Sequence, residues 1–145
     1  MVRRMRLGRR NLCCAAAFGL LLWACGGESS RLVTVRTGTG SGSIVFEVKN
    51  NTDVAINSLF LAKHEDVKME LSQESPEAQK VWGGDLIDHA IPTGERVPVP
   101  VPGPGRWDVK ATDADGRYQH IAAVKLEAGG RYILELYDRN WRVGP

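Results

Sequence analysis

The sequence predicts an all-β fold, a small antiparallel β-sandwich that follows a signal peptide and a flexible tether. Three observations support this prediction. From Ser43 onward, apolar and polar residues alternate with a period of two, as in half-buried strands. These alternating segments recur at intervals of roughly ten residues, separated by turn sequences. The chain before Ser43 contains instead a charged and apolar leader and a stretch rich in glycine, serine and threonine.

The leader, residues 1–24, has the organisation of a secretory signal peptide. Five arginines and no acidic residue occur within residues 1–10, and a mostly apolar run then extends from Leu12 to Ala24. A transmembrane helix needs about 20 apolar residues, so this run is too short to remain as one. We therefore expect residues 1–24 to be removed.

The tetrapeptide Leu22-Trp23-Ala24-Cys25 resembles a bacterial lipobox, the sequence cleaved by lipoprotein signal peptidase. The resemblance implies a diacylglyceryl thioether on the sulfur of Cys25 and a further acyl chain, such as palmitate, on its new amino group. Two or more acyl chains hold a protein stably at a membrane, at about 0.8 kcal/mol per buried CH₂. The alternative is ordinary secretory cleavage nearby, which leaves Cys25 as a free thiol.

Removal of the leader changes the properties of the chain. The whole chain has a formal net charge of +2, and loss of five arginines makes it −3. Nothing basic then suggests a nucleic-acid partner. Cys13 and Cys14 lie in the leader, so the mature chain cannot form an internal disulfide. Gly26 follows the lipobox where aspartate would favour the inner membrane, which implies the outer membrane if the host is diderm.

Residues 25–42 form the predicted lipidated N-terminus and tether, because glycine, serine and threonine dominate them. The alternating sequence RLVTVRT, residues 31–37, could instead be a first strand, and we leave both possibilities open. The β-sandwich domain is predicted over residues 43–140. Its first strand has Ile44, Phe46 and Val48 on one face, and a second apolar run covers residues 54–62.

A short helix is predicted after residue 75. Ser75, Pro76 and Glu77 supply an N-cap, a proline at the first helical position and an acid in the first turn. Gly83 and Gly84 are expected to end this helix.

The sequence ERVPVPVPGPG predicts an edge strand. Pro98, Pro100 and Pro102 lack N–H donors on one lateral side, whereas the intervening valines keep theirs on the other. Such a strand can pair on one side only, and its free side is protected from pairing with other chains. The alternative is a polyproline II segment bound by a partner.

Three further strands complete the predicted domain. Alternation over residues 107–112 is followed by the turn sequence DADG at residues 113–116, a return strand over 117–126, and a last strand over 131–137. Tyr132, after two glycines, resembles the tyrosine corner of Greek-key sandwiches, whose hydroxyl hydrogen-bonds upstream backbone. We therefore expect an immunoglobulin-like arrangement.

Residues 43–126 also resemble a group of small, mostly uncharacterised exported bacterial β-sandwich proteins. The resemblance rests on VKNNT, WGGDLI, IPTGERVPV and GRWDVKATDADG, in that order. It implies the fold and an envelope location, and no established activity.

The best candidate binding site is the loop formed by Trp82, Gly83, Gly84 and Asp85. An indole beside two glycines offers a stacking surface and close backbone approach, as sugar-binding sites use. The structural alternative buries Trp82 in the domain, with Asp85 hydrogen-bonded to loop N–H groups.

Other motifs favour structural interpretations. Asp113, Asp115 and Gly116 begin like a calcium loop, but Val124 occupies the twelfth position, where a glutamate is required. The three histidines lack zinc-site spacing and are interpreted as solvated loop residues: His64, His89 and His120. The alternative is that His64 with Glu65 and Asp66, or His89 with Asp88, binds a metal or acts as a base. Neither GxSxG nor a phosphate-binding loop occurs.

We therefore expect no catalytic residues, metal or cofactor. The predicted protein is a lipid-anchored envelope lipoprotein with a non-enzymatic interaction or structural module. Its expected partners are the membrane, through Cys25, and an envelope protein or glycan. The alternatives are a carbohydrate- or small-ligand-binding module and an accessory lipoprotein of a secretion or motility assembly.

Overall fold

The structure is a computed structural model that describes residues 27–68 and 75–144. The described residues form a mostly β fold, so the all-β prediction is confirmed at this level. Its elements in chain order are β1 (Arg31–Arg36), β2 (Val45–Asn50), β3 (Ser58–Lys63), η1 (His64–Asp66), α1 (Pro76–Trp82), β4 (Arg96–Pro98), β5 (Gly105–Thr112), β6 (Tyr118–Leu126), β7 (Arg131–Leu136) and η2 (Asp138–Asn140).

Two predictions for the N-terminal part have different outcomes. Residues 31–36 form strand β1, so the alternative that made this stretch a strand is the observed one, and the folded part begins before Ser43. The signal peptide, Cys25 and Gly26 lie outside the described residues. In the part of the chain that the structure describes, no helix is long and apolar enough to cross a bilayer.

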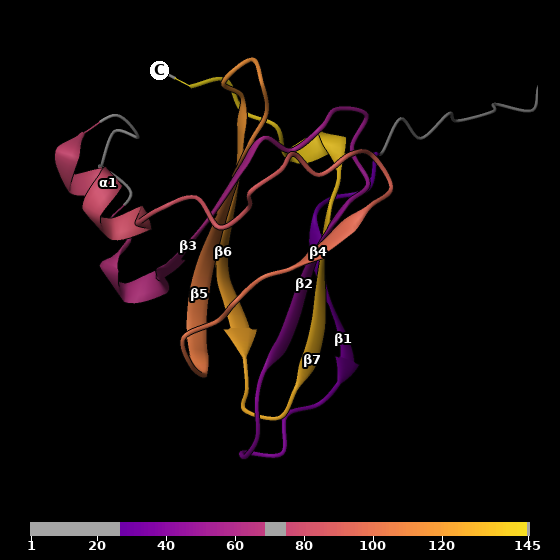
Figure 1. Ribbon diagram of the computed structural model, residues 1–145, viewed down its shortest axis with the longest axis vertical. Coiled ribbons are helices and arrows are strands. Elements are labelled where there is room, and N and C mark those ends of the chain that lie inside the picture. Colours follow the sequence, from indigo (N-terminus) through magenta and orange to yellow (C-terminus); the bar gives the residue numbers. More distant parts are fainter. Residues whose placement is uncertain (1–26, 69–74, 145) are drawn as a thin grey trace, which may run out of the picture.

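The strands form two sheets, with the orders β1-β7-β2-β4 and β3-β5-β6 (Figure 1). The strand pairs are antiparallel except β2 and β7, which run parallel, a difference from the expected antiparallel arrangement. Parallel pairing requires a long connection, and the whole of β3 to β6 lies between these two strands in the sequence. The last strand thereby enters the sheet between β1 and β2.

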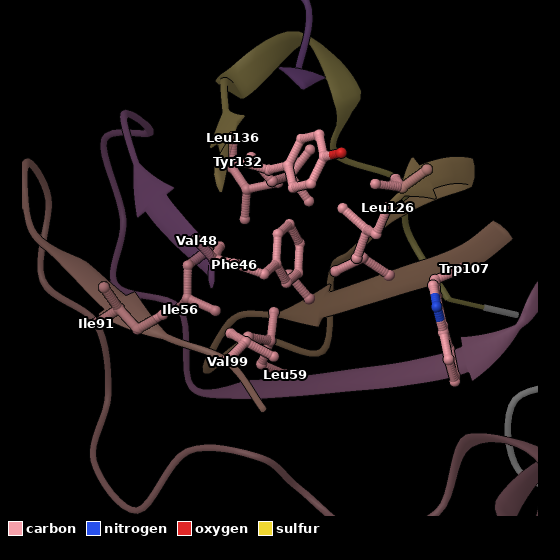
Figure 2. Close-up of a cluster of buried hydrophobic side chains, with 14 residues drawn as sticks. Phe46, Val48, Ile56, Leu59, Ile91, Val99, Trp107, Leu126, Tyr132 and Leu136 are labelled. Atoms are coloured by element: carbon pink, nitrogen blue, oxygen red, sulfur yellow. The ribbon is translucent and has the colours of Figure 1, made fainter. Parts of the chain in front are cut away.

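Residues of both sheets contribute to one hydrophobic core, and Figure 2 shows part of it. Phe46 and Val48 of β2 point into it as predicted, and Leu59, Val109 and Leu134 reach it from β3, β5 and β7. Alternate residues of each strand supply these side chains because successive strand residues face opposite sides of a sheet.

Tyr132 has the role that the sequence predicted. The backbone N–H of Glu127 donates to the Tyr132 hydroxyl over 3.0 Å, and the ring is buried in the core. Gly130 lies directly beside this ring, where any Cβ would collide with it. Glycine is therefore required for the close packing of the β6–β7 turn.

Both outer strands of the first sheet are protected against further pairing. β4 is an edge strand, as predicted: Val99 N–H donates to the Phe46 carbonyl over 2.8 Å, while Pro98 offers no donor on the free side. At the other edge, β1 has a register shift between Thr34 and Arg36, and Val35 lies within it. A bulge in a strand that also carries charged residues discourages edge-to-edge association.

Helix α1 has the predicted boundaries. The Ser75 hydroxyl accepts a hydrogen bond from Ala78 N–H over 3.0 Å, and Gly83 ends the helix with a φ of 67°. The helix lies beside β3 in Figure 1. It packs Ala78 and Trp82 against Ala62 on the face of the β3-β5-β6 sheet that is turned away from the main core.

Candidate functional site

The predicted binding loop lies where α1 meets this outer sheet face. Trp82 is only 8% exposed, so its indole is covered instead of presented for stacking. The Asp85 carboxylate accepts hydrogen bonds from the N–H groups of Leu59 and Ile87, over 2.9 and 3.2 Å. Gly83 and Gly84 are exposed. These positions favour the structural interpretation of the loop.

A row of three side chains lies beneath Trp82. Lys110 of β5 is paired directly with Phe60 of β3 on one side and with His120 of β6 on the other. Its ammonium lies 5.0 Å from the Phe60 ring centre and 5.3 Å from that of Trp82. Burial lowers the pKa of Lys110. Two aromatic faces thus stabilise a charge that is largely withdrawn from water.

Asp108 lies two residues before Lys110 on the same face and is buried. One carboxylate oxygen accepts a hydrogen bond from His64 Nδ1 over 2.7 Å, and the other accepts from His120 Nε2 over 2.8 Å. The Trp82 and His120 rings meet edge to face, with centres 5.5 Å apart. We call Asp108, His64, His120, Lys110 and Trp82 the outer-face cluster.

A β-bulge supplies a third donor to Asp108. Trp107 pairs with Val124 and Val109 with Ile121, so two residues of β6 lie opposite Asp108 alone. Ala123 in this bulge has a φ of 58°, a conformation that residues other than glycine seldom adopt. Its N–H donates to Asp108 Oδ1 over 2.8 Å. The carboxylate therefore stabilises the strained backbone of the bulge.

The electrostatics of Asp108 follow from these contacts. Burial by itself raises the pKa of this carboxyl, but the hydrogen bonds from Ala123, His120 and His64 outweigh burial and leave its pKa below the ordinary value. An ionised Asp108 assigns a proton to His64 Nδ1 and to His120 Nε2.

The pairing of a carboxylate with imidazoles in the outer-face cluster also occurs in catalytic and metal sites, whereas here its hydrogen bonds join η1, β5 and β6. A carboxylate that orients an imidazole occurs in general-base sites and behind metal-bound histidines. Among the described residues, no three His, Cys, Asp or Glu side chains are grouped to hold a metal ion. The cluster connects η1, β5 and β6, and Trp82 joins helix α1 to it.

The interpretation of His64 and His120 as solvated loop residues is wrong for these two, because both are half-buried and bonded to Asp108. His89 is exposed, as expected. In the sequence, Asp108 and Lys110 alternate with apolar residues over 107–111, and this pattern predicts that both lie on the polar face of the strand. No sequence signal showed that a helix covers this face.

The DADG sequence forms a turn. Asp113 accepts hydrogen bonds from the N–H groups of Asp115 and Arg117, and it also pairs with the Arg117 guanidinium. The carboxylate that began the apparent calcium motif is therefore engaged within the turn itself.

The stability of the protein should depend on pH through Asp108. Its folded pKa lies below 3.8, the ordinary value for an aspartate. Its contribution to the free energy of unfolding is therefore present above pH 3.8 and lost as the pH falls through the folded pKa. Urea unfolding at a series of pH values below 4.5 should give a shallower decline for Asp108→Asn than for the unaltered chain. Parallel declines would contradict this assignment.

Comparison of the chain with known protein families, curated proteins and solved structures found no match. The lipobox and the likeness to exported β-sandwich proteins therefore remain predictions from the sequence.

Proposed function

We propose that this protein is a lipid-anchored lipoprotein of the cell envelope, with a non-enzymatic interaction or structural module held close to the membrane. The observation that carries the proposal is the short distance in sequence between Cys25 and the fold. Ser30 is already fixed by hydrogen bonds to Asn140, Gln119 and Tyr137, at 2.7 to 2.9 Å. Only residues 26–29 would then separate the lipid from the domain, a reach of roughly 15 Å.

The finer architecture in this proposal is an immunoglobulin-like β-sandwich. Two features support it: both sheets contribute to one core, and the Tyr132 hydroxyl binds upstream backbone. The engagement of Trp82 and Asp85 in packing and backbone contacts disfavours the alternative in which this loop binds a carbohydrate or small ligand.

An anchor at Cys25 would also orient the domain. Strand β1 starts beside Gln119 and Tyr137 and runs for about 20 Å to the opposite end, where Thr39 N–H donates to the Ala128 carbonyl. In Figure 1 this far end carries the β1–β2 and β6–β7 connections. We infer that it faces away from the bilayer. An outer-membrane location is part of this proposal for a diderm host.

Intact mass spectrometry of membrane-extracted protein tests the anchor. We expect the mass of residues 25–145 plus acyl chains, because the lipobox predicts cleavage before Cys25 and acylation of it. The variant Cys25→Ser should lose this species. A cleaved chain without acyl groups would overturn the proposal.

Fluorescence quenching of the lipidated protein tests the orientation of the domain relative to the bilayer. Ser29→Cys and Ser41→Cys each place a thiol-reactive fluorophore at an exposed position, one near each end of the domain. After reconstitution in vesicles that contain nitroxide-labelled lipid, the fluorophore at residue 29 should be quenched more strongly. Equal quenching would contradict the inferred orientation.

A further inference from the structure

A cavity of about 380 Å³ opens at the end of the domain opposite to Ser30. Three segments line it: Gly38 and Gly40 after β1, residues 104–106 at the start of β5, and residues 125–128 at the end of β6. This volume lies at the small end of the range for small-molecule sites. A Cβ placed on Gly40 would meet no atom within 4 Å. The backbone at Gly40 therefore leaves space that a ligand can approach, whereas Gly38 packs closely against Glu127.

The charges beside this cavity are unbalanced. Arg106 and Lys125 are directly opposite each other in the β5–β6 pair, and both are exposed. Like charges in directly paired positions destabilise a sheet. Glu127 neutralises Lys125 through a contact of 2.8 Å. Within residues 27–68 and 75–144, no hydrogen bond or ion pair is formed by the Arg106 guanidinium. One positive charge therefore remains on the cavity lining.

The rest of the lining is largely apolar. Leu126 closes the cavity towards the core, and Pro104 and Ala128 contribute carbon surface. A ligand that fits both features carries one anionic group and an apolar body. The planar guanidinium of arginine binds carboxylate and phosphate oxygens through two parallel hydrogen bonds.

We propose that this cavity binds a small organic oxyanion, a carboxylate or phosphate on an apolar body, with its charged group at Arg106. The inference does not depend on the lipid anchor, since it rests on residues of the folded domain alone.

Backbone-amide NMR of the full chain carrying Cys25→Ser tests this site with simple probes. Phenylphosphonate and phenylacetate combine an oxyanion with an apolar ring, and their relative affinities distinguish phosphate from carboxylate. Both should shift the amide signals of Gly40, Arg106 and Ala128. Benzyl alcohol lacks the charge and inorganic phosphate lacks the ring, so the affinity for each should be lower by at least about tenfold. Equal affinity for either control, or shifts confined to other residues, would overturn the proposal.

A pair of matched variants tests whether Arg106 is the group that binds the anion. Arg106→Gln should weaken phenylphosphonate binding about tenfold, which is the expected loss of one charge-assisted contact. Arg139→Gln makes the same change at an exposed position in η2, at the other end of the domain, and should leave binding unchanged. Because Arg106 is exposed, its variant should keep the amide spectrum of a folded chain. Unchanged affinity in Arg106→Gln, or equal losses in both variants, would exclude Arg106 as the anion-binding group.

Discussion

Replacement of Asn50 by alanine is expected to lower the free energy of unfolding by about 3 kcal/mol, because the side chain satisfies several buried backbone groups at once. Asn50 ends β2 and is fully buried. Its Nδ2 donates to the carbonyls of Val54 and Ile91 over 2.8 and 2.9 Å. Its Oδ1 accepts from the N–H and hydroxyl of Thr52 over 2.9 and 2.7 Å.

The effect should be smaller than the loss of four separate hydrogen bonds. The Thr52 hydroxyl has one proton, which lies within reach of both Asn50 Oδ1 and the Val54 carbonyl, and in the variant it can donate to Val54 alone. The Ile91 carbonyl also accepts from Ile56 N–H. These carbonyls therefore keep one partner each in the variant. The Thr52 N–H loses its acceptor in a buried position, where an unsatisfied donor costs about 1–3 kcal/mol.

The neighbouring Asn51 provides a matched control. It is half-buried, and within the described part of the chain its side-chain amide forms no hydrogen bond, although its backbone N–H binds the Leu136 carbonyl. Asn51→Ala should change stability by less than about 0.5 kcal/mol. Urea unfolding measures the stability of both variants, and their m-values should equal that of the unaltered chain. Similar losses for the two would show that the turn tolerates the absence of the Asn50 amide.

Replacement of Asp108 by alanine is the second large effect that we expect, a loss of about 3 kcal/mol. It leaves the Ala123 N–H and two imidazole N–H groups without their acceptor in a half-buried site. Trp82 packs on His120, so the contact of α1 with the sheet should loosen as well. Urea unfolding measures the loss, and near-ultraviolet circular dichroism reports on Trp82.

Two variants separate the role of this carboxylate from the loss of a charge. Asp115→Ala removes an exposed acid from the DADG turn and should have little effect. Asp108→Asn keeps one acceptor oxygen for the Ala123 N–H, and it should cost less than Asp108→Ala near pH 7. If Asp115→Ala were as destabilising as Asp108→Ala, the hydrogen bonds of the outer-face cluster would not be the cause.

Local patterns in the sequence were sufficient for several elements. The spacing of Phe46 and Val48 placed a strand, Ser75 and Pro76 marked the start of the helix, and the proline series predicted a sheet edge. Each of these features acts through the backbone within a few residues: a cap, a missing N–H or the two-residue period of a strand. Neighbours in the chain therefore determine them.

The assembly of distant segments could not be read in this way. The sequence of residues 31–37 was compatible with a tether and with a strand. Pairing with β7 makes residues 31–36 the strand β1. The parallel pairing of β2 with β7 likewise joins segments more than 80 positions apart in the chain, as in the pair Phe46 and Tyr132. Hydrogen bonds between strands depend on which strands meet, and no local signal records that.

The candidate site shows the same division. Local sequence patterns were enough to predict that Trp82 ends a helix, that Asp108 and Lys110 share the polar face of a strand, and that Tyr132 follows a glycine turn. Local patterns did not predict that α1 covers this face, or that a buried carboxylate there binds two histidines 44 and 12 positions away. A polar side chain is equally compatible with water or with a buried partner. Its partners and its pKa therefore depend on which surface packs over it.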